Sequence, residues 1–142
     1  MPTTSPLLSQ IRAQKEKRFE NVSDLRIFVE MQHPKKFDQV SVDMVVYHAE
    51  VFHFNRHRGV HISLISKEAA DHFSDIQQEL QSLDDITRDP FLFNLTIWDA
   101  ESVDKLKPGT QLSLSGVYNL SIWNNRLLQG CVSIDQCANL VK

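Results

Sequence analysis

The chain has 142 residues, of which 42% are hydrophobic and 23% are charged, and its formal net charge is −3. This composition predicts one folded domain with its own core and excludes a largely disordered or uniformly basic chain. Residues 1–66 carry nine lysines and arginines against seven acids, whereas residues 67–142 carry six against eleven. Any surface that binds nucleic acid must therefore be local.

No apolar run approaches the ~18–20 residues that span a membrane, and the first twenty residues lack the apolar centre of a signal peptide. We therefore expect a cytoplasmic protein without membrane contacts. Cys131 and Cys137 are the only cysteines. In a reducing compartment two such cysteines are usually free thiols.

The N-terminal residues 1–18 predict a flexible basic arm, or a short helix carrying Leu7, Leu8 and Ile11. Its cations are Arg12, Lys15, Lys17 and Arg18. The remainder, residues 19–142, is predicted to form the folded domain. Its first β signal is 24–32, where apolar residues alternate with polar ones at period two from Leu25 to Met31.

The segments 41–56 and 60–66 predict a β-hairpin that turns at residues 57–59. In the first strand one parity looks like core: Val45, Tyr47, Ala49 and Val51. Residues 67–83 predict the main helix, since Ala69, Phe73, Ile76, Leu80 and Leu83 form one apolar stripe. Ser66 is the expected N-cap.

The second half of the chain predicts strands at 91–99, 110–123 and 126–134. Residues 100–109 predict a short helical link that ends at Pro108-Gly109. Gly116 and Gly130 are expected to bend their strands. Asn124-Asn125 suits a two-residue turn, because asparagine tolerates the left-handed conformation.

The stretch from Phe93 to Ile134 resembles the OB-fold of single-stranded DNA-binding proteins and of the replication protein A type. The matching pieces are Trp98-Asp99, Val103 to Leu106, Lys107-Pro108-Gly109, Gly116 and Asn124-Asn125-Arg126. The resemblance covers about a third of the chain. It implies a mainly β protein with one main helix, an OB-fold-like five- to six-stranded barrel. The chain departs from the bacterial proteins in ending CANLVK rather than in an acidic tail.

Two alignments with this fold compete. In the first, 41–56, 60–66 and 91–98 are strands one to three of the barrel, and 67–83 is an inserted helix. In the second, 24–32, 41–56 and 60–66 are those three strands, and 67–83 is the helix that caps the barrel. The second alignment leaves an extra strand near the C-terminus.

OB-folds bind single strands by stacking bases on aromatic side chains while cations follow the phosphates. Side chains of both kinds are expected on the outer faces of the two predicted hairpins. The predicted nucleic-acid-binding residues are Phe52, Phe54, Arg56, His57, Arg58, Trp98, Trp123, Asn125 and Arg126. The alternative for each aromatic is packing within the fold, and for each arginine an ordinary surface charge.

Metal binding and catalysis have little support. His53, His57 and His61 have the spacing of zinc ligands on a helix, but on a strand that spacing separates them by ~13 Å. The two cysteines have no second pair to complete a four-thiolate site. Familiar catalytic motifs are absent from the sequence. We predict neither a metal, a cofactor nor an enzymatic activity.

Two functions remain. The first is binding of single-stranded DNA, with RNA as the other candidate, in replication or recombination, alongside proteins of those processes. This protein is expected to form a homo-oligomer through exposed edge strands. The second is a protein-interaction or assembly module with the same barrel, which the negative net charge favours.

Overall fold

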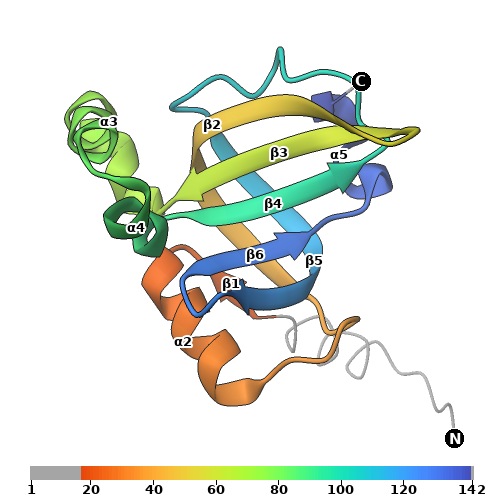
Figure 1. Ribbon diagram of the computed structural model, residues 1–142, viewed down its shortest axis with the longest axis horizontal. Coiled ribbons are helices and arrows are strands. Elements are labelled where there is room, and N and C mark those ends of the chain that lie inside the picture. The colour runs from red at the N-terminus through yellow and green to blue at the C-terminus, as the bar shows by residue number, and fades with distance from the viewer. Residues whose placement is uncertain (1–16, 142) are drawn as a thin grey trace, which may run out of the picture.

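The computed structural model describes residues 17–141, which form six strands with helices near the ends of the strands (Figure 1). The strands are β1 Arg18–Phe19, β2 Val40–Phe54, β3 His57–Ile65, β4 Phe93–Trp98, β5 Gln111–Trp123 and β6 Leu127–Cys131. The α-helices are α2 Val22–Gln32, α3 Phe73–Ser82, α4 Asp85–Arg88 and α5 Ile134–Val141. Two 3₁₀ helices are η1 Lys67–His72 and η2 Asp89–Phe91. No helix in this described part is long and apolar enough to cross a membrane.

Five of the strands close into a ring in the order β2–β3–β4–β6–β5–β2. All pairs in the ring are antiparallel except β4 with β6, which run parallel. The long strand β2 closes the ring because its first part pairs with β5 and its second part pairs with β3. The short β1 adds to β2 in parallel outside the ring. The protein is thus mainly β, as the sequence predicts.

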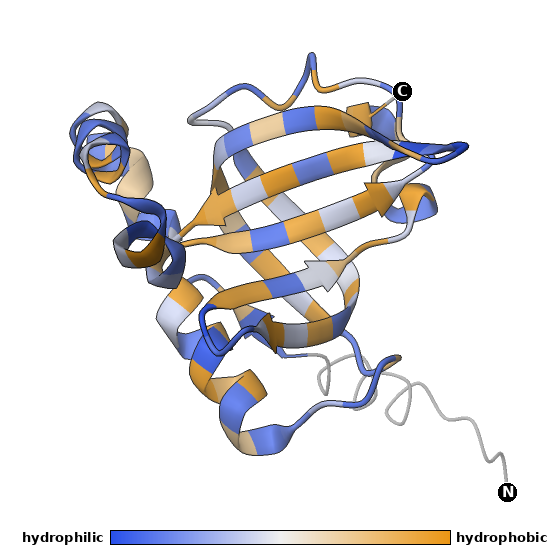
Figure 2. Cartoon of the chain, viewed as in Figure 1, coloured by the Kyte–Doolittle hydropathy of each residue, from blue (hydrophilic) through white to orange (hydrophobic). Residues whose placement is uncertain are grey.

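The core fills the ring, and helices cover its openings. Alternate residues of β3 and β4 point inward, namely Val60, Ile62, Leu64, Phe93, Leu95 and Ile97. The matching stripes of apolar and polar residues are visible along these strands (Figure 2). The same core includes Val22, Leu25 and Val29 from α2, and Cys137 and Val141 from α5. A buried side chain of this kind contributes about 1.5–3 kcal/mol.

The strand predicted at 24–32 is wrong, because this segment belongs to helix α2. Asn21 caps the helix by accepting a hydrogen bond from the amide of Asp24, and the chain leaves it through a left-handed His33. Ile27 and Met31 are 52% and 72% exposed, although the period-two pattern had placed them beside Leu25 in a core. The apolar residues of this segment fit both the two-residue period of a strand and the 3.6-residue period of a helix. The N-cap at Asn21 favours the helix. The second alignment with the OB-fold is therefore excluded.

The first predicted hairpin exists, but its turn lies two residues earlier, at Asn55-Arg56 rather than at 57–59. Asn55 provides the left-handed conformation with a φ of 55°. A register shift between Val46 and His48 also reverses the parity of β2. Val46 belongs to the main core, whereas Tyr47 packs into a second cluster outside the ring. The predicted core set is therefore split between the two sides of β2.

The predicted helix at 67–83 is divided into η1 and α3, and Ser66 does not cap it. The Ser66 hydroxyl instead accepts a hydrogen bond from the amide of Val22. The predicted apolar stripe packs against the outside of the ring, where Ala69 and Leu80 join Val45, Ile65 and Leu92. Residues 100–109 are not helical, whereas the segment between α3 and β4 contains α4 and η2. Helix α5 was not predicted.

The bend predicted at Gly116 is confirmed. The turn predicted at Asn124-Asn125 is present, but it has three residues rather than two and includes Arg126, because Trp123 pairs with Leu127. Asn124 and Asn125 have φ values of 53° and 56°, and they join β5 to β6. Gly116 has a φ of 69°, and the pairing of β5 with β2 shifts beside it. Of the predicted basic arm, residues 1–16 lie outside the described part of the chain. Arg18 belongs to β1.

Candidate nucleic-acid interface

The outer face of β3 and β4 carries the candidate site. In these strands the residues between the buried positions point outward. Cross-strand pairs on this face join Gly59 with Trp98, His61 with Thr96, and Ser63 with Asn94. The outward residues of the second part of β2 continue the face, with Phe52 opposite Gly59.

Three rings form an aromatic platform on this face, namely Phe52, His61 and Trp98. The Phe52 and His61 rings stack with centroids 4.0 Å apart and planes inclined by 16°. Trp98 meets Phe52 edge-on at a centroid distance of 5.2 Å, and it remains 43% exposed. His57 in turn lies edge-on to Trp98 at 6.2 Å. Exposed rings in such a group offer flat apolar surface for a further ring.

Gly59 makes the platform possible because a side chain there would have no room. A Cβ atom on Gly59 would lie 2.6 Å from the carbonyl oxygen of Ile97 and 2.7 Å from the ring of Phe52. The Phe52 ring therefore lies directly over the backbone of its cross-strand partner. This contact holds the ring against the sheet instead of in solvent.

His61 was considered only as a metal ligand, and the structure adds it to the platform. Its Nδ1 lies 3.2 Å from the hydroxyl of Thr96. Burial lowers the pKa of His61 from its ordinary value, although Glu50 opposes this effect. His61 is therefore mainly neutral at pH 7, where it acts as an aromatic ring rather than as a cation.

The tip of the β2–β3 hairpin stands beside the platform. A shallow hollow of about 340 Å³ is lined by His57, Trp98 and Asp99. Asp99 has a left-handed φ of 67°, and its amide donates to the carbonyl oxygen of Arg58. Phe54 and Arg56 are exposed at the same tip. Six of the nine predicted residues thus cluster here: Phe52, Phe54, Arg56, His57, Arg58 and Trp98.

Two of the three predicted arginines are already paired with acids. Arg58 has the parity opposite to that of Phe52 and His57, and it forms an ion pair with Glu101. Arg126 Nε lies 2.7 Å from a carboxylate oxygen of Asp89, without a well-aligned hydrogen bond. The positive charge that these two arginines offer to a phosphate is therefore reduced.

The β5–β6 hairpin lies at the other end of the same face. Trp123 pairs with Leu127 of β6, and the next residue of β6, Leu128, pairs with Phe93 of β4. Trp123 is therefore level with the residue before Phe93. Trp98 lies about six residues further along β4, or roughly 20 Å from Trp123. Trp123 is 52% exposed, and the Arg126 guanidinium lies 5.7 Å from its ring centroid. Trp123, Asn125 and Arg126 therefore do not share one pocket with the platform.

Polar side chains line the outer face between the two ends. The Ser63 hydroxyl donates to Asn94, and the Gln129 amide donates to the Ser121 hydroxyl. Asn94 and Gln129 are themselves cross-strand partners, so these four residues form one row across β3, β4, β6 and β5. Amides and hydroxyls of this kind can hydrogen-bond the edges of bases.

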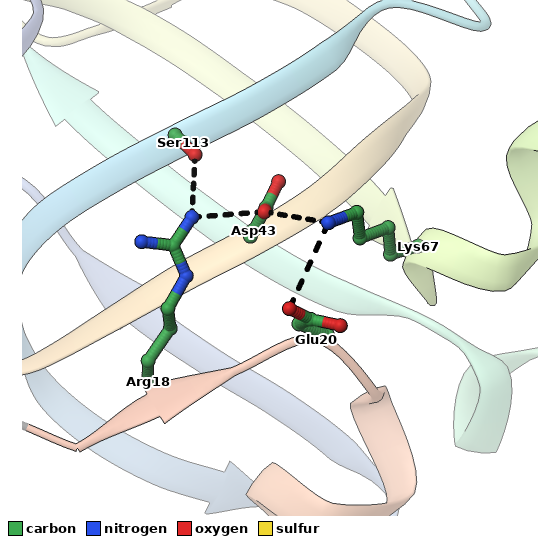
Figure 3. Close-up of polar contacts among 5 residues, drawn as sticks. All are labelled: Arg18, Glu20, Asp43, Lys67 and Ser113. Carbon is green, nitrogen blue, oxygen red and sulfur yellow. Dashed lines mark hydrogen bonds and ion pairs between the residues drawn. The ribbon is translucent and has the colours of Figure 1, made fainter.

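Asp43 is a buried charge that the sequence analysis missed. It lies on the outside of β2, where both Arg18 and Lys67 donate to the same carboxylate oxygen, at 2.9 and 3.1 Å (Figure 3). The Arg18 hydrogen bond, which is the largest cause, and Lys67 together hold the pKa of Asp43 below its ordinary value. Arg18 also donates to Ser113 of β5, so this cluster links β1, β2, β5 and η1. We interpret it as structural.

Within residues 17–141, no three histidines, cysteines or acids are grouped as metal ligands. The cysteines described there are free thiols. Comparisons with known proteins found no matching family model, no similar curated protein and no similar solved structure. The functional argument therefore rests on the geometry of this chain.

Proposed function

We propose that this protein is a non-enzymatic OB-fold-like barrel that binds single-stranded nucleic acid, with single-stranded DNA as the first candidate and RNA as the second. The observation that carries the proposal is the exposed platform of Phe52, His61 and Trp98 on the outer face of β3 and β4. In OB-folds, oligonucleotides bind on strands two and three and on the loops between strands one and two and four and five.

The ring supports this assignment through its topology. If β2 is strand one of the barrel, then β3 and β4 are strands two and three, and β5 and β6 are strands four and five. The two binding loops are then the Asn55-Arg56 turn and the Asn124-Asn125-Arg126 turn. The predicted residues at these turns thus occupy the two ends of one path, with the polar row between them.

We infer that a strand crosses this face with bases stacked on the platform at one end and on Trp123 at the other. Such stacking is worth about 1–3 kcal/mol per base and tolerates any base, because every base has a π-face. The path between the platform and Trp123 is roughly 20 Å long. It suits a short site near the lower end of the ~4–16 nucleotides that one OB-fold binds.

A protein-interaction module is the second candidate, and the pairing of Arg58 and Arg126 with acids favours it. An aromatic face with few free cations resembles the centre of a protein interface. The homo-oligomer, the role in replication or recombination and the cytoplasmic location stay predictions.

The deciding experiment is fluorescence anisotropy with a labelled oligo-dT, the matching oligo-U and a duplex of equal length, each over a salt series. We expect binding to the single strands at low salt, weaker binding to the duplex, and affinity that falls as salt rises. The salt slope should be shallow, since two of the three predicted arginines are paired with acids. Failure to bind either single strand at low salt would leave the protein-interaction module as the surviving candidate.

A further inference from the structure

A second surface, independent of the aromatic face, lies outside the ring. Here η1 and α3 form an apolar groove of about 270 Å³ with the end of β3 and with η2. Ala69 and Leu80 are buried at its base, whereas Phe91 on its wall is 54% exposed. Ile65 and Ile76 complete the apolar lining. A groove of this chemistry fits aliphatic side chains of another segment.

The surroundings of the groove are strongly acidic. Residues 67–91 contain seven acids and only two bases, Lys67 and Arg88. Both bases already have partners. Lys67 donates to Asp43, and Arg88 donates to the backbone carbonyl oxygens of Leu80 and Leu83 at the C-terminal end of α3. Glu68 lines the groove and also an adjacent hollow of about 430 Å³, which contains Glu20, Asp24 and Asp71. The occupant should therefore combine aliphatic and positive residues.

The N-terminal segment of this chain has that composition. Residues 1–16 carry Leu7, Leu8 and Ile11, followed by Arg12 and Lys15.

The segment also joins the fold close to the groove. The carbonyl oxygen of Glu20 accepts a hydrogen bond from the amide of Lys67, the first residue of η1, at 2.8 Å. The side chain of Asn21 donates to Glu68 on the groove. Glu20 is three residues from Lys17, and the six residues from Lys17 back to Ile11 can span up to ~20 Å. Ile11 is thus within reach of the groove, and Leu7 and Leu8 have further length.

We propose that residues 1–16 bind this groove in the same molecule. Leu7, Leu8 and Ile11 enter its apolar part, and Arg12 and Lys15 lie against the acidic rim. The surface is then a docking site for a basic, aliphatic segment, and the chain supplies its own. This inference does not depend on nucleic-acid binding.

Paramagnetic broadening in the full-length chain tests the proposal. A spin label is attached at Ser9→Cys in a Cys131→Ser background, where the other cysteine, Cys137, is buried. We expect the amide signals of Ile76 and Leu80 to lose at least half of their intensity. The amide of Asn55, in the turn at the far end of the ring, should be unaffected (Figure 1).

Two variants and one control variant establish which contact is responsible. Leu8→Asp together with Ile11→Asp should abolish the broadening. Ile76→Glu on the groove should also abolish it, whereas Ile27→Glu, at an exposed isoleucine of α2, should not. The proposal is overturned if the groove signals keep their intensity. It is equally overturned if broadening arises only when spin-labelled chains are mixed with separate isotope-labelled chains, which would assign the groove to a second copy.

Discussion

Replacing Gly59 with alanine is expected to destabilise the protein and to displace the platform at the same time. The new Cβ atom would lie 2.6 Å from the Ile97 carbonyl oxygen and 2.7–2.8 Å from two ring atoms of Phe52. Ordinary contacts of this kind lie near 3.5–4.0 Å, so the β3–β4 ladder or the ring must move. Overpacking of this kind costs about 1–3 kcal/mol. In a domain of this size, that corresponds to a melting temperature lower by roughly 3–12 °C.

Thermal unfolding followed by circular dichroism measures this change, and Gly130→Ala is the matched control. A Cβ at Gly130 meets the end of the Leu120 side chain at 3.0 Å and its next neighbours at 3.3 Å. A flexible side-chain end can yield more easily than a backbone carbonyl, so Gly130→Ala should cost less. The near-ultraviolet signal of Trp98 should change only in Gly59→Ala. Equal melting temperatures for wild type and Gly59→Ala would refute the close contact of Phe52 with the backbone.

Three further predictions concern stability. Asp43→Ala should lower the free energy of unfolding by about 1.5–2 kcal/mol. This is the lower part of the range for hydrogen bonds to charged groups, because the partners Arg18 and Lys67 are half exposed. Asp104→Ala on the surface should change little. Because the pKa of Asp43 is lowered in the folded state, wild type should hold this stability above pH ~3.9 and lose it as pH falls further, which an acid titration of both variants checks. The pKa of His61 is also lowered in the folded state, so stability should fall as the pH drops from about 6.5 through the pKa of folded His61. The fall should be smaller in His61→Gln. Chemical denaturation at pH 7.5 and pH 5.5 measures it. Asn21→Ala should cost about 1 kcal/mol through loss of the α2 cap, and an unchanged denaturation midpoint would contradict that role.

Strands β3, β4 and β5 could be predicted because they alternate apolar and polar residues over at least four positions, and β6 because it follows a turn signal after β5. Helix α2 could not be predicted in the same way, since its apolar residues fit period two as well as the helical stripe of Val22, Leu25 and Val29. The two local signals that favoured the helix were Asn21 before the stripe and Pro34 after it. The alternating pattern was given more weight than these two signals. It depended on Ile27 and Met31, which are apolar but exposed on the helix.

The aromatic platform depends on the register between β2 and β3. In the sequence, only the position of the turn between these strands specifies that register. A turn centred on residues 57–59 would place Phe52 opposite Leu64, whereas the actual turn at Asn55-Arg56 places it opposite Gly59. The stacking of Phe52 on His61 follows from that shift. Asp43 could not be predicted as a paired charge either, since Arg18 was assigned to the flexible arm. The contact of Arg18 with Asp43 depends on the pairing of β1 with β2, which joins residues far apart in the sequence.

The affinity of Trp98→Ala for a labelled oligo-dT at low salt tests the central claim most directly. Losing one stacked base should weaken binding by about 1–3 kcal/mol, or roughly 5- to 150-fold. Phe37→Ala removes another exposed ring, in the loop before β2, and should leave the affinity within about twofold, once circular dichroism has shown both variants to be folded. If both variants bind like wild type, the platform of Phe52, His61 and Trp98 does not hold the strand.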